Sequence, residues 1–457
     1  MSFNKKTDLT VGSPGKVLLR FAVPLLISTI FQQMYTIADS VIAGRFSENG
    51  ADAVAALGSS YPITMVFMAV ALGMCTGAGV VIAHHYGAKL LEKMKTAVFT
   101  AIISAFVISI VFTVIGLLTG EPLLNLLSTK EAIIDDSLLY LQIYVLGMVF
   151  LFNYNICNGI FTAMGDAVIP LVFLIISSVS NIILDYVFVM ANPQESVAGV
   201  AWATFICQGV CSVAAFIVLM IKLRKIKCEE KYQIFSFSAL KDIWKLALPS
   251  VLQQSFVSVG NLFVQWAVNQ FTVAVVAGYS SAIKLNNFTI TSLMTMSNGM
   301  SSFTAQNIGA QKADRIKQGF KSCLIIMVTA ALIFTGIYVV FSEQLIGFFL
   351  PPDTADSTAA IQVGKLFLII VSPFFAVAAL KITCDGVLKG GGDMKSFMTD
   401  TFTDLILRVV LAIVLSSKFL LNSEIGIWLS WPIGWATSAI MAYCFYRKGK
   451  WRDSLDL

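Results

Sequence analysis

Charged residues are scarce in this chain of 457 residues. Asp, Glu, Lys and Arg make up 12% of the sequence and hydrophobic residues 57%, whereas a soluble domain carries about 25% charged residues. Only two histidines occur, and the eight cysteines lack the spacing of a zinc site or a disulfide framework. The HExxH and GxSxG motifs of hydrolases and the glycine-rich phosphate loops are also missing. These absences argue against a soluble domain, an enzyme and an ATP-powered protein, and we expect no cofactor.

Apolar runs long enough to cross the roughly 30 Å hydrocarbon core of a bilayer recur along the whole sequence. They predict an all-α membrane protein with twelve transmembrane helices, the first of which is a retained helix rather than a removable signal. The expected helices span residues 17–44, 55–84, 94–119, 136–163, 167–190, 197–222, 243–269, 275–306, 318–341, 358–387, 395–418 and 425–446.

Basic residues alternate between the loops. With twelve helices and a cytoplasmic N-terminus, 24 of the 31 Lys and Arg residues fall in cytoplasmic segments, as the positive-inside rule requires. We therefore expect a multi-pass protein of the inner (plasma) membrane with both termini in the cytoplasm. The net charge of +5 reflects basic loops against anionic lipid head groups of the bilayer, and it indicates no nucleic-acid partner.

The second half of the chain repeats the first. RFAVP at 20–24 recurs as KLALP at 245–249, AHHYGAKLLEKMKTAVF at 83–99 recurs as AQNIGAQKADRIKQGF at 305–320, and NGIFTAMGD at 158–166 recurs as DGVLKGGGD at 385–393. Six helices per half give both halves the same orientation, so the repeats are parallel and related by an axis along the membrane normal.

The repeat predicts two pseudo-symmetric six-helix lobes. We place the N-terminal lobe at 1–222, a cytoplasmic linker at 223–242 and the C-terminal lobe at 243–457. A pseudo-symmetric pair of bundles can open a cleft first to one side and then to the other, which favours transport by alternating access.

Acidic residues inside apolar helices are costly and are therefore candidate functional residues. The first predicted helix carries Asp39 and the fifth carries Asp185, each about 9–10 Å from the outer end at 1.5 Å per residue. Thr204 of the sixth helix lies about 13 Å from the same side. Asn181 precedes Asp185, and Tyr35 precedes Asp39, by one helical turn on the same face. These depths predict one polar cluster in the N-terminal half.

Such a cluster suits two tasks. Carboxylate, amide and hydroxyl oxygens could hold a hard cation such as Na⁺. Two neighbouring buried carboxylates could instead share a proton, because both cannot easily stay ionised. The sequence leaves open whether H⁺ or Na⁺ binds.

The C-terminal half carries a second set of charges. Lys381 and Asp385 lie four residues apart on the tenth helix, and Asp400, Asp404 and Arg408 follow the same spacing on the eleventh. Each set therefore lines one helix face. We expect a Lys381–Asp404 pair flanked by an Asp404–Arg408 pair. The set is either structural or a second coupling or substrate site.

Other residues are candidates for the substrate path. Lys284 in the eighth helix has no evident charged partner, and with Tyr35 it is a candidate for lining a substrate cleft. Pro24 and Pro249, at matching places in the first and seventh helices, are expected to kink them. The 34 Phe and 17 Met residues suit flat, lipophilic and often cationic molecules, although they also cover lipid-facing surfaces.

In their order, the helix-1 proline, the AHHYGA and AQNIGA helix ends and the two GD-terminated motifs resemble the multidrug and toxic compound extrusion (MATE) transporters. The resemblance covers residues 16–448 and looks closest to the DinF-like and MepA-like branch. It implies a V-shaped pair of six-helix lobes and antiport of drugs or toxic organic cations against H⁺ or Na⁺, by a functional monomer.

The same resemblance implies which residues couple the ion. Asp39, Asn181, Asp185 and Thr204 match the branch's ion-coupling pattern position by position, and Asn158 matches its helix-4 asparagine. Asn158 lies only eight residues from the inner end of its helix, so its depth fits poorly. The acids that the NorM-like branch carries on helices 7 and 10 are missing here, so coupling through the N-terminal half is favoured.

A lipid-linked oligosaccharide flippase of related architecture is the alternative. Its cleft would need several basic residues for a pyrophosphate, and the helices hold only Lys284, Lys365, Lys381 and Arg408. A channel would need neither duplicated halves nor an asymmetric acid cluster. An ion-coupled exporter is therefore the favoured function.

Overall fold

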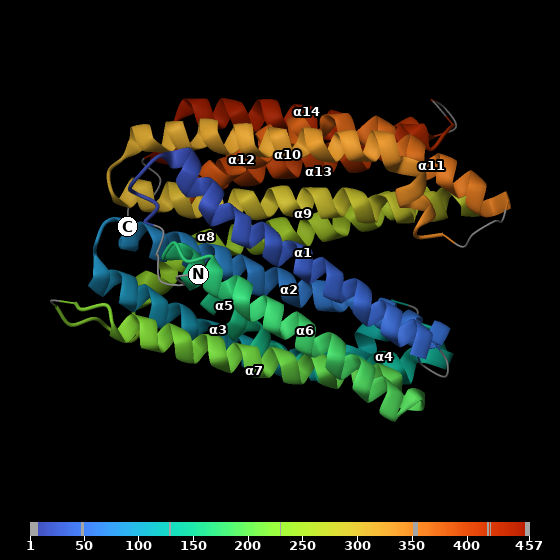
Figure 1. The fold of residues 1–457 in the computed structure, drawn as a ribbon, viewed down its shortest axis with the longest axis horizontal. Helices are drawn as coiled ribbons and strands as arrows, with labels where there is room; N and C mark the ends of the chain where they lie inside the picture. The colour runs from blue at the N-terminus through green and yellow to red at the C-terminus, as the bar shows by residue number, and fades with distance from the viewer. Residues whose placement is uncertain are drawn as a thin grey trace. The chain divides into compact units, whose positions relative to one another are not determined.

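The computed structural model describes residues 8–46, 50–127, 129–228, 230–350, 355–417, 420 and 422–452. These ranges contain α-helices, turns and three short 3-10 helices, and no β-strand (Figure 1). The α-helices are α1 (Pro14–Phe46), α2 (Gly50–Gly87), α3 (Leu91–Leu126), α4 (Glu131–Leu146), α5 (Met148–Ala163), α6 (Val168–Ala191), α7 (Ser196–Arg224), α8 (Phe237–Val268), α9 (Val273–Gly309), α10 (Ala313–Gly347), α11 (Ala355–Val371), α12 (Phe375–Gly390), α13 (Met394–Ser416) and α14 (Ile425–Lys448). The 3-10 helices are η1 (Pro193–Glu195), η2 (Ser372–Phe374) and η3 (Lys450–Arg452).

The twelve predicted helices are confirmed. Two of them consist of two α-helices each, and α10 is kinked at Phe341. The fourth consists of α4 and α5, which meet at Gly147 with a bend of 49°. The tenth consists of α11 and α12, joined by η2. In the described residues, eight spans are long and apolar enough to cross a membrane, and the bent α4–α5 pair makes nine. The remaining helices, α8, α9 and α13, carry more polar residues.

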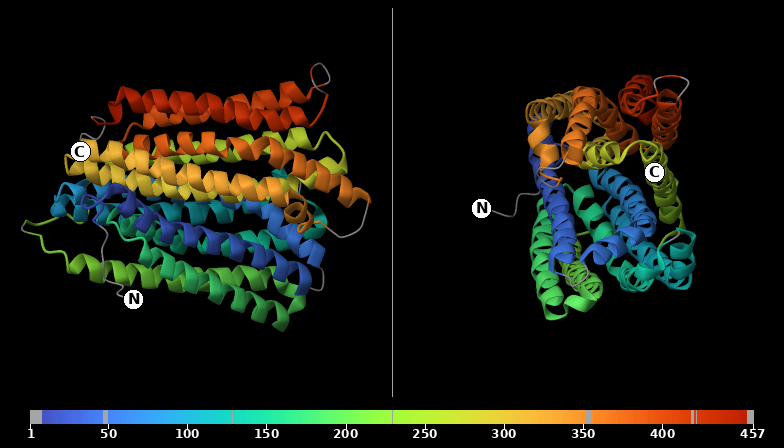
Figure 2. Two further views of the ribbon diagram at one scale, coloured as in Figure 1. Left: turned by 45° about the horizontal axis from the view of Figure 1, so that its top comes forward. Right: turned by 90° about the vertical axis from the view of Figure 1, so that its right-hand side faces the viewer.

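The chain divides into two compact units. Unit 1 is formed chiefly by Arg20–Val251, and unit 2 by Leu9–Leu19 with Leu252–Asp456. Within unit 1, α2 packs against α3, α4 and α5, and α6 packs along α7 (Figure 1). Within unit 2, α9 packs against α11 and α12, and α13 packs along α14 (Figure 2). The predicted lobe boundaries at 222 and 243 stay predictions.

The repeated GD motifs have a local structural cause. Gly165 and Gly392 adopt the left-handed conformation, with φ of 79° and 76°, which glycine adopts without steric cost and which ends a helix. The next residue then accepts a hydrogen bond from the start of the following helix. Asp166 Oδ1 accepts from the backbone N–H of Val168 over 3.2 Å, and Asp393 Oδ1 accepts from that of Ser396 over 3.3 Å. Each motif is therefore a helix stop followed by an acid that accepts from the first turn of the next helix. Asp393 is the N-cap of α13, and Asp166 directly precedes Ala167, the N-cap of α6.

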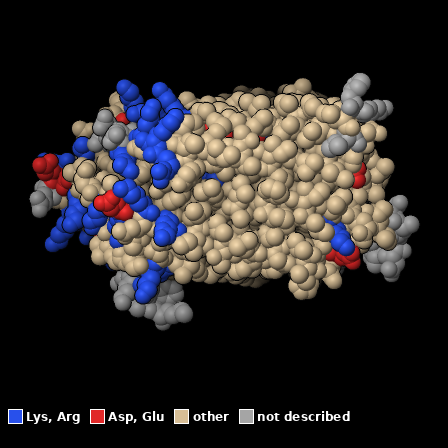
Figure 3. All heavy atoms as spheres, turned by 90° about the horizontal axis from the view of Figure 1, so that it is seen from above, with Lys and Arg blue, Asp and Glu red and all other residues tan. Residues whose placement is uncertain are grey.

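On the face of unit 2 shown in Figure 3, charged side chains gather near the helix ends. Over unit 2, basic side chains gather at the end that carries the α9–α10 and α12–α13 turns, and the middle of this face is built almost wholly from uncharged side chains (Figure 3). Exposed basic residues at these turns include Lys312, Lys317 and Lys395. An apolar flank bounded by charged ends is the pattern of a helix bundle in a bilayer.

The helix breaks do not coincide with the prolines predicted to kink. Pro24 lies inside the continuous helix α1 and Pro249 inside α8, so their role as hinges stays a prediction. The breaks at Gly147 and at Ser372–Phe374 fall at equivalent places in the fourth helix of each repeat, and α10 has a further kink at Phe341.

Candidate ion-coupling site

Asp185 and Asn181 lie one turn apart on α6 and are buried, with 0% and 4% of their surface exposed. Asn181 Nδ2 donates to Asp185 Oδ1 and to Thr204 Oγ1 of α7, each over 3.4 Å. Asp39 of α1 lies within hydrogen-bonding reach of Asp185. The structure therefore brings these four predicted residues into one network, and their role in ion coupling stays a prediction.

Several oxygens of this network are unsatisfied. Among the described residues, Asp39 Oδ1, Asn181 Oδ1 and Asp185 Oδ2 are buried and have no hydrogen-bond partner, although buried acceptors are normally satisfied. Two ionised carboxylates are both acceptors, so their approach is favourable only with a proton or a cation between them. The network thus presents converging oxygen ligands for a positive charge.

Two tyrosines of α4 border the network. Tyr140 lies within electrostatic range of Asp39, Asp185 and Tyr35. Its ring stacks on that of Tyr144, one turn further along α4, with 6.3 Å between ring centroids. The predicted cleft residue Tyr35 is thus placed beside the acids, and α4 contributes two aromatic hydroxyl groups to the same region.

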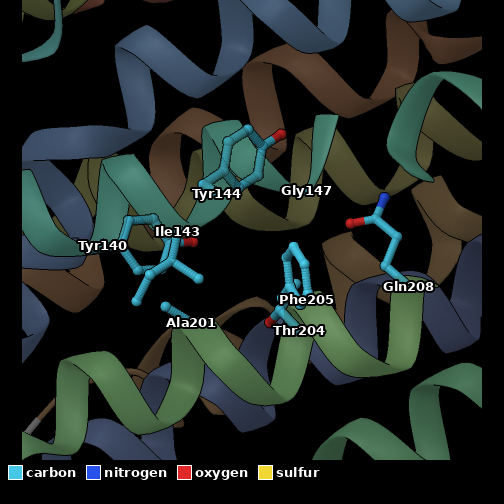
Figure 4. Close-up of a pocket in the computed structure, with 8 residues that line it drawn as sticks. All are labelled: Tyr140, Ile143, Tyr144, Gly147, Ala201, Thr204, Phe205 and Gln208. Carbon is cyan, nitrogen blue, oxygen red and sulfur yellow. The ribbon is translucent and has the colours of Figure 1, made fainter. Parts of the chain in front are cut away.

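A pocket lies between α4 and α7, next to Thr204. Figure 4 shows the side chains of α4 pointing toward those of α7. The space bounded by its lining side chains is about 240 Å³ with open solvent included, and the enclosed part is about the size of one water molecule. It is lined by Tyr140, Ile143, Tyr144, Gly147, Ala201, Thr204, Phe205 and Gln208. In this conformation it has room for a water molecule or an ion.

Sequence reasoning missed the contribution of α4. The available signal was the spacing of Tyr140 and Tyr144, which places two tyrosines on one helix face. Gly147, where the helix breaks, also lines the pocket, and a Cβ there would lie 3.3 Å from Phe205 Cδ2. A lone glycine in an apolar run did not reveal that break.

Asn158 lies apart from the network. In the part of the chain that the structure describes, it makes no hydrogen bond to Asn181, Asp185 or Thr204, and its side chain lies beside Tyr154. Its amide oxygen is buried without a partner. A role for Asn158 in coupling therefore stays a prediction that this conformation does not support.

Unit 2 holds the second set of charges in its interior. Lys381 Nζ lies 2.6 Å from Asp385 Oδ2 on α12 and donates to Thr401 Oγ1 of α13 over 3.1 Å. Thr401 in turn donates to Asp400 Oδ1 over 3.3 Å. All four side chains are buried, so α12 and α13 enclose a connected polar chain.

A second ion pair lies further along α13. Arg408 Nη2 lies 3.5 Å from Asp404 Oδ2, and the guanidinium group lies over the Trp431 ring of α14 at 4.4 Å from its centroid. Gly434 of α14 makes room for the acid, since a Cβ there would lie 2.5 Å from Asp404 Oδ1.

The expected pairing of Lys381 with Asp404 was wrong. Lys381 pairs with Asp385 on its own helix, because an (i, i+4) spacing brings the two side chains together and Thr401 takes the ammonium group's other contact. The expected Asp404–Arg408 pair is confirmed.

Comparison with known proteins identifies the fold. The family model described as MatE matches residues 24–187 and, a second time, residues 249–414. The two matches cover more than half of the chain and correspond to its two repeats. This chain belongs to the MatE family. It is a multi-pass membrane transporter and not an enzyme.

Relatives along the whole length agree with this assignment. The chain is 28% identical to the probable multidrug resistance protein YoeA of Bacillus subtilis, over 93% of this chain and 92% of YoeA. It is 22% identical to the multidrug export protein MepA of Staphylococcus saprophyticus, over 91% and 89% of the two chains. A crystal structure of a MATE protein in complex with MaL6 superposes with a TM-score of 0.90, at 22% identity and 98% coverage of both chains. The predicted MATE fold, with two repeated lobes, is confirmed.

Of the two remaining intramembrane cations of this MatE protein, Lys365 is paired with an acid and Lys284 is not. Lys365 Nζ lies 2.6 Å from Glu343 Oε1. Lys284 is exposed, and its ammonium group lies over the Phe349 ring at 5.1 Å from the centroid. No acidic residue among those described pairs with Lys284. Its assignment to a substrate cleft stays a prediction.

Proposed function

We propose that the protein exports lipophilic, often cationic small molecules across the plasma membrane in exchange for H⁺ or Na⁺, by alternating access. The observation that carries this proposal is the buried network of Asp39, Asn181, Asp185 and Thr204 in unit 1. We expect a functional monomer with both termini in the cytoplasm.

The chemistry of the network supports an exchangeable cation. Asp39 and Asp185 are brought together, and among the described residues no ion pair with a Lys or Arg is recorded for either acid. Two buried carboxylates without a counter-charge are unstable in an apolar medium. A proton or Na⁺ arriving from solution would supply that counter-charge, and its departure would leave repulsion between the two acids.

The change in repulsion gives a route to coupling. Asp39 lies on α1 and Asp185 on α6, so binding of a cation draws two helices together and its release lets them separate. Tyr140 and the pocket beside Thr204 lie in this region. Movement of α1 relative to α6 would therefore also change the binding of a substrate there. Ion and substrate must then weaken each other's binding by equal factors.

The substrate class comes from the relatives. YoeA and MepA are named as multidrug resistance and export proteins, and the Phe- and Met-rich composition fits adaptable apolar surfaces. The flippase alternative has less support, because Lys365, Lys381 and Arg408 are each paired with an acid. Only Lys284 among the intramembrane cations considered is then available to hold a pyrophosphate.

The test is ethidium efflux from drug-sensitive cells or uptake into energised inverted vesicles. We compare the wild type with Asp39→Asn and Asp185→Asn, and use Asp52→Asn, an exposed acid in the first turn of α2, as the control. Ionophores that separately collapse the H⁺ and Na⁺ gradients identify the ion.

We expect both network variants to lose efflux at normal membrane levels, with Asp52→Asn behaving as wild type. Full efflux in both network variants would refute coupling through unit 1. Absence of efflux by the wild type would point to a narrower substrate or to the flippase.

A further inference from the structure

The polar chain inside unit 2 contains more acid than its neighbouring cations neutralise. Asp404 is matched by Arg408. Lys381 is the only cation within ion-pair distance of Asp385 among the described residues, and Asp400 lies within hydrogen-bonding reach of that same Asp385. Two carboxyl groups therefore share one ammonium group.

Burial makes this imbalance costly. Asp400 is 0% exposed, and Asp385 and Lys381 are 5% and 6% exposed. With both acids ionised, the three groups would carry one uncompensated negative charge in a low-dielectric interior, which is strongly unfavourable. Lys389, one turn beyond Asp385, lies within electrostatic range of both acids. It directs its Nζ to Asn298 Oδ1 at 3.1 Å and forms no ion pair with either acid.

Two oxygens mark where the missing charge would bind. Asp385 Oδ1 and Asp400 Oδ2 are buried and have no hydrogen-bond partner in the described structure, whereas the opposite oxygens are held by Lys381 and Thr401. Since each free oxygen is an acceptor, a single proton between the two carboxyl groups satisfies both and neutralises the surplus charge.

We propose that Asp385 and Asp400 form a proton-binding site in unit 2, separate from the Asp39–Asp185 network of unit 1. Lys381 and Thr401 are its positioning residues. When the proton leaves, Asp400 becomes an anion, and the ammonium group of Lys381 is one hydroxyl group away from it. A rotation of Lys381 toward Asp400 would compensate the new charge.

The groups facing the site are few. From α12, Asp385, Lys381 and the thiol of Cys384 act on Asp400, and Lys389 acts on both acids. Thr401 is the neighbour of Asp400 on α13. Asp404 follows one turn along α13 and acts on Lys381. From α9, the uncharged Ser297 donates to the backbone carbonyl of Ile382 over 2.7 Å, and Trp431 of α14 lies on Arg408.

Infrared difference spectroscopy on the purified full-length protein tests the proposal, with pH as the only variable. A protonated carboxyl group has a carbonyl stretch distinct from that of a carboxylate. We use the Asp39→Asn/Asp185→Asn background, which removes the unit 1 acids, and compare it with the same background carrying Asp400→Asn or Asp385→Asn. The measurement needs no transported substrate, so its result can be interpreted even if the export proposal is wrong.

We expect the background protein to retain a protonated carboxyl band that disappears at high pH. Loss of that band in Asp400→Asn, with a shifted or lost band in Asp385→Asn, supports the site. Absence of any such band in the background protein overturns the proposal even if the unit 2 variants do not fold. A band unchanged by both unit 2 substitutions also overturns it.

A role for this proton in transport rests on the proposed export function. The expected effect is a lower number of protons moved per ethidium in Asp400→Asn proteoliposomes, with transport retained. An unchanged ratio would restrict the site to structure.

Discussion

In unit 1, the neighbours of Asp39 and Asp185 are the uncharged amide of Asn181 and hydroxyl of Thr204. In unit 2, Asp385 and Asp404 each pair with a cation. The repeat makes the contrast sharper. The motif alignment that places Asn158 opposite Asp385 also places Asn181 opposite Arg408, at the same offset of 227 residues. One fold thus carries an open set of oxygen ligands in one repeat and a largely neutralised charge cluster in the other.

This difference indicates a division of labour. An unpaired carboxylate set must take its counter-charge from solution, so it is suited to an exchanging ion. In unit 2 each ion pair lies within one helix, and the hydrogen bond from Lys381 to Thr401 links α12 to α13. Asp385 and Asp400 share the single ammonium group of Lys381, so this part of the second set has a role beyond holding the structure in the proposal above.

The largest expected effect is on the stability of unit 2. Lys381→Met leaves Asp385 and Asp400 buried without their cation, and loss of one partner of a buried ion pair costs about 3–5 kcal/mol. We expect a marked drop in melting temperature of the detergent-purified protein, measured by size-exclusion after heating.

Two variants control for this. Lys365→Met removes a partly exposed ion pair, where little change is expected. Lys381→Met/Asp385→Asn should recover much of the loss, because it also reduces the stranded charge. A melting temperature of Lys381→Met equal to that of Lys365→Met would show that the unit 2 charges do not hold the helices together.

Tight packing around Asp404 should give a smaller effect. Gly434→Ala would place a Cβ 2.5 Å from Asp404 Oδ1 and displace the acid from Arg408, at a cost of about 1–3 kcal/mol for overpacking. The matched control is Gly336→Ala on α10, where a Cβ meets no atom within 4 Å and helix propensity favours alanine by up to about 1 kcal/mol. If the melting temperature of Gly434→Ala equalled or exceeded that of Gly336→Ala, the close approach of α14 to Asp404 would not contribute to stability.

Much of this architecture was predictable from sequence, for a simple physical reason. The length of an apolar run and its bounding charges determine a transmembrane helix, so all twelve were found. A spacing of four residues also gave the Asn181–Asp185 and Asp404–Arg408 contacts correctly.

Contacts between helices were harder to predict. From the sequence, Lys381 could pair with an acid on α12 or on α13. The packing of α12 on α13 determines that its ammonium group contacts Thr401 in addition to Asp385. At the bend, Gly147 lies close to Phe205 of a different helix, where a Cβ would be 3.3 Å from Phe205 Cδ2. Sequence periodicity describes one helix at a time and carries no information on such choices.

The smallest expected effect is on ion affinity in unit 1. Thr204→Val removes an acceptor of Asn181 Nδ2, and loss of one hydrogen bond of about 1 kcal/mol would weaken the apparent affinity for the coupling ion about fivefold. Thr204→Ser keeps the hydroxyl group and should behave as wild type. Equal ion dependence of transport in Thr204→Val and wild type would remove Thr204 from the site.

The most direct test of coupling in unit 1 separates exchange from accumulation in proteoliposomes. Ethidium exchange without an ion gradient requires only substrate binding and alternating access, whereas accumulation against a concentration gradient also requires coupling. We predict that Asp39→Asn/Asp185→Asn retains exchange and loses accumulation. Accumulation equal to wild type in this double variant would contradict the assignment of ion coupling to unit 1.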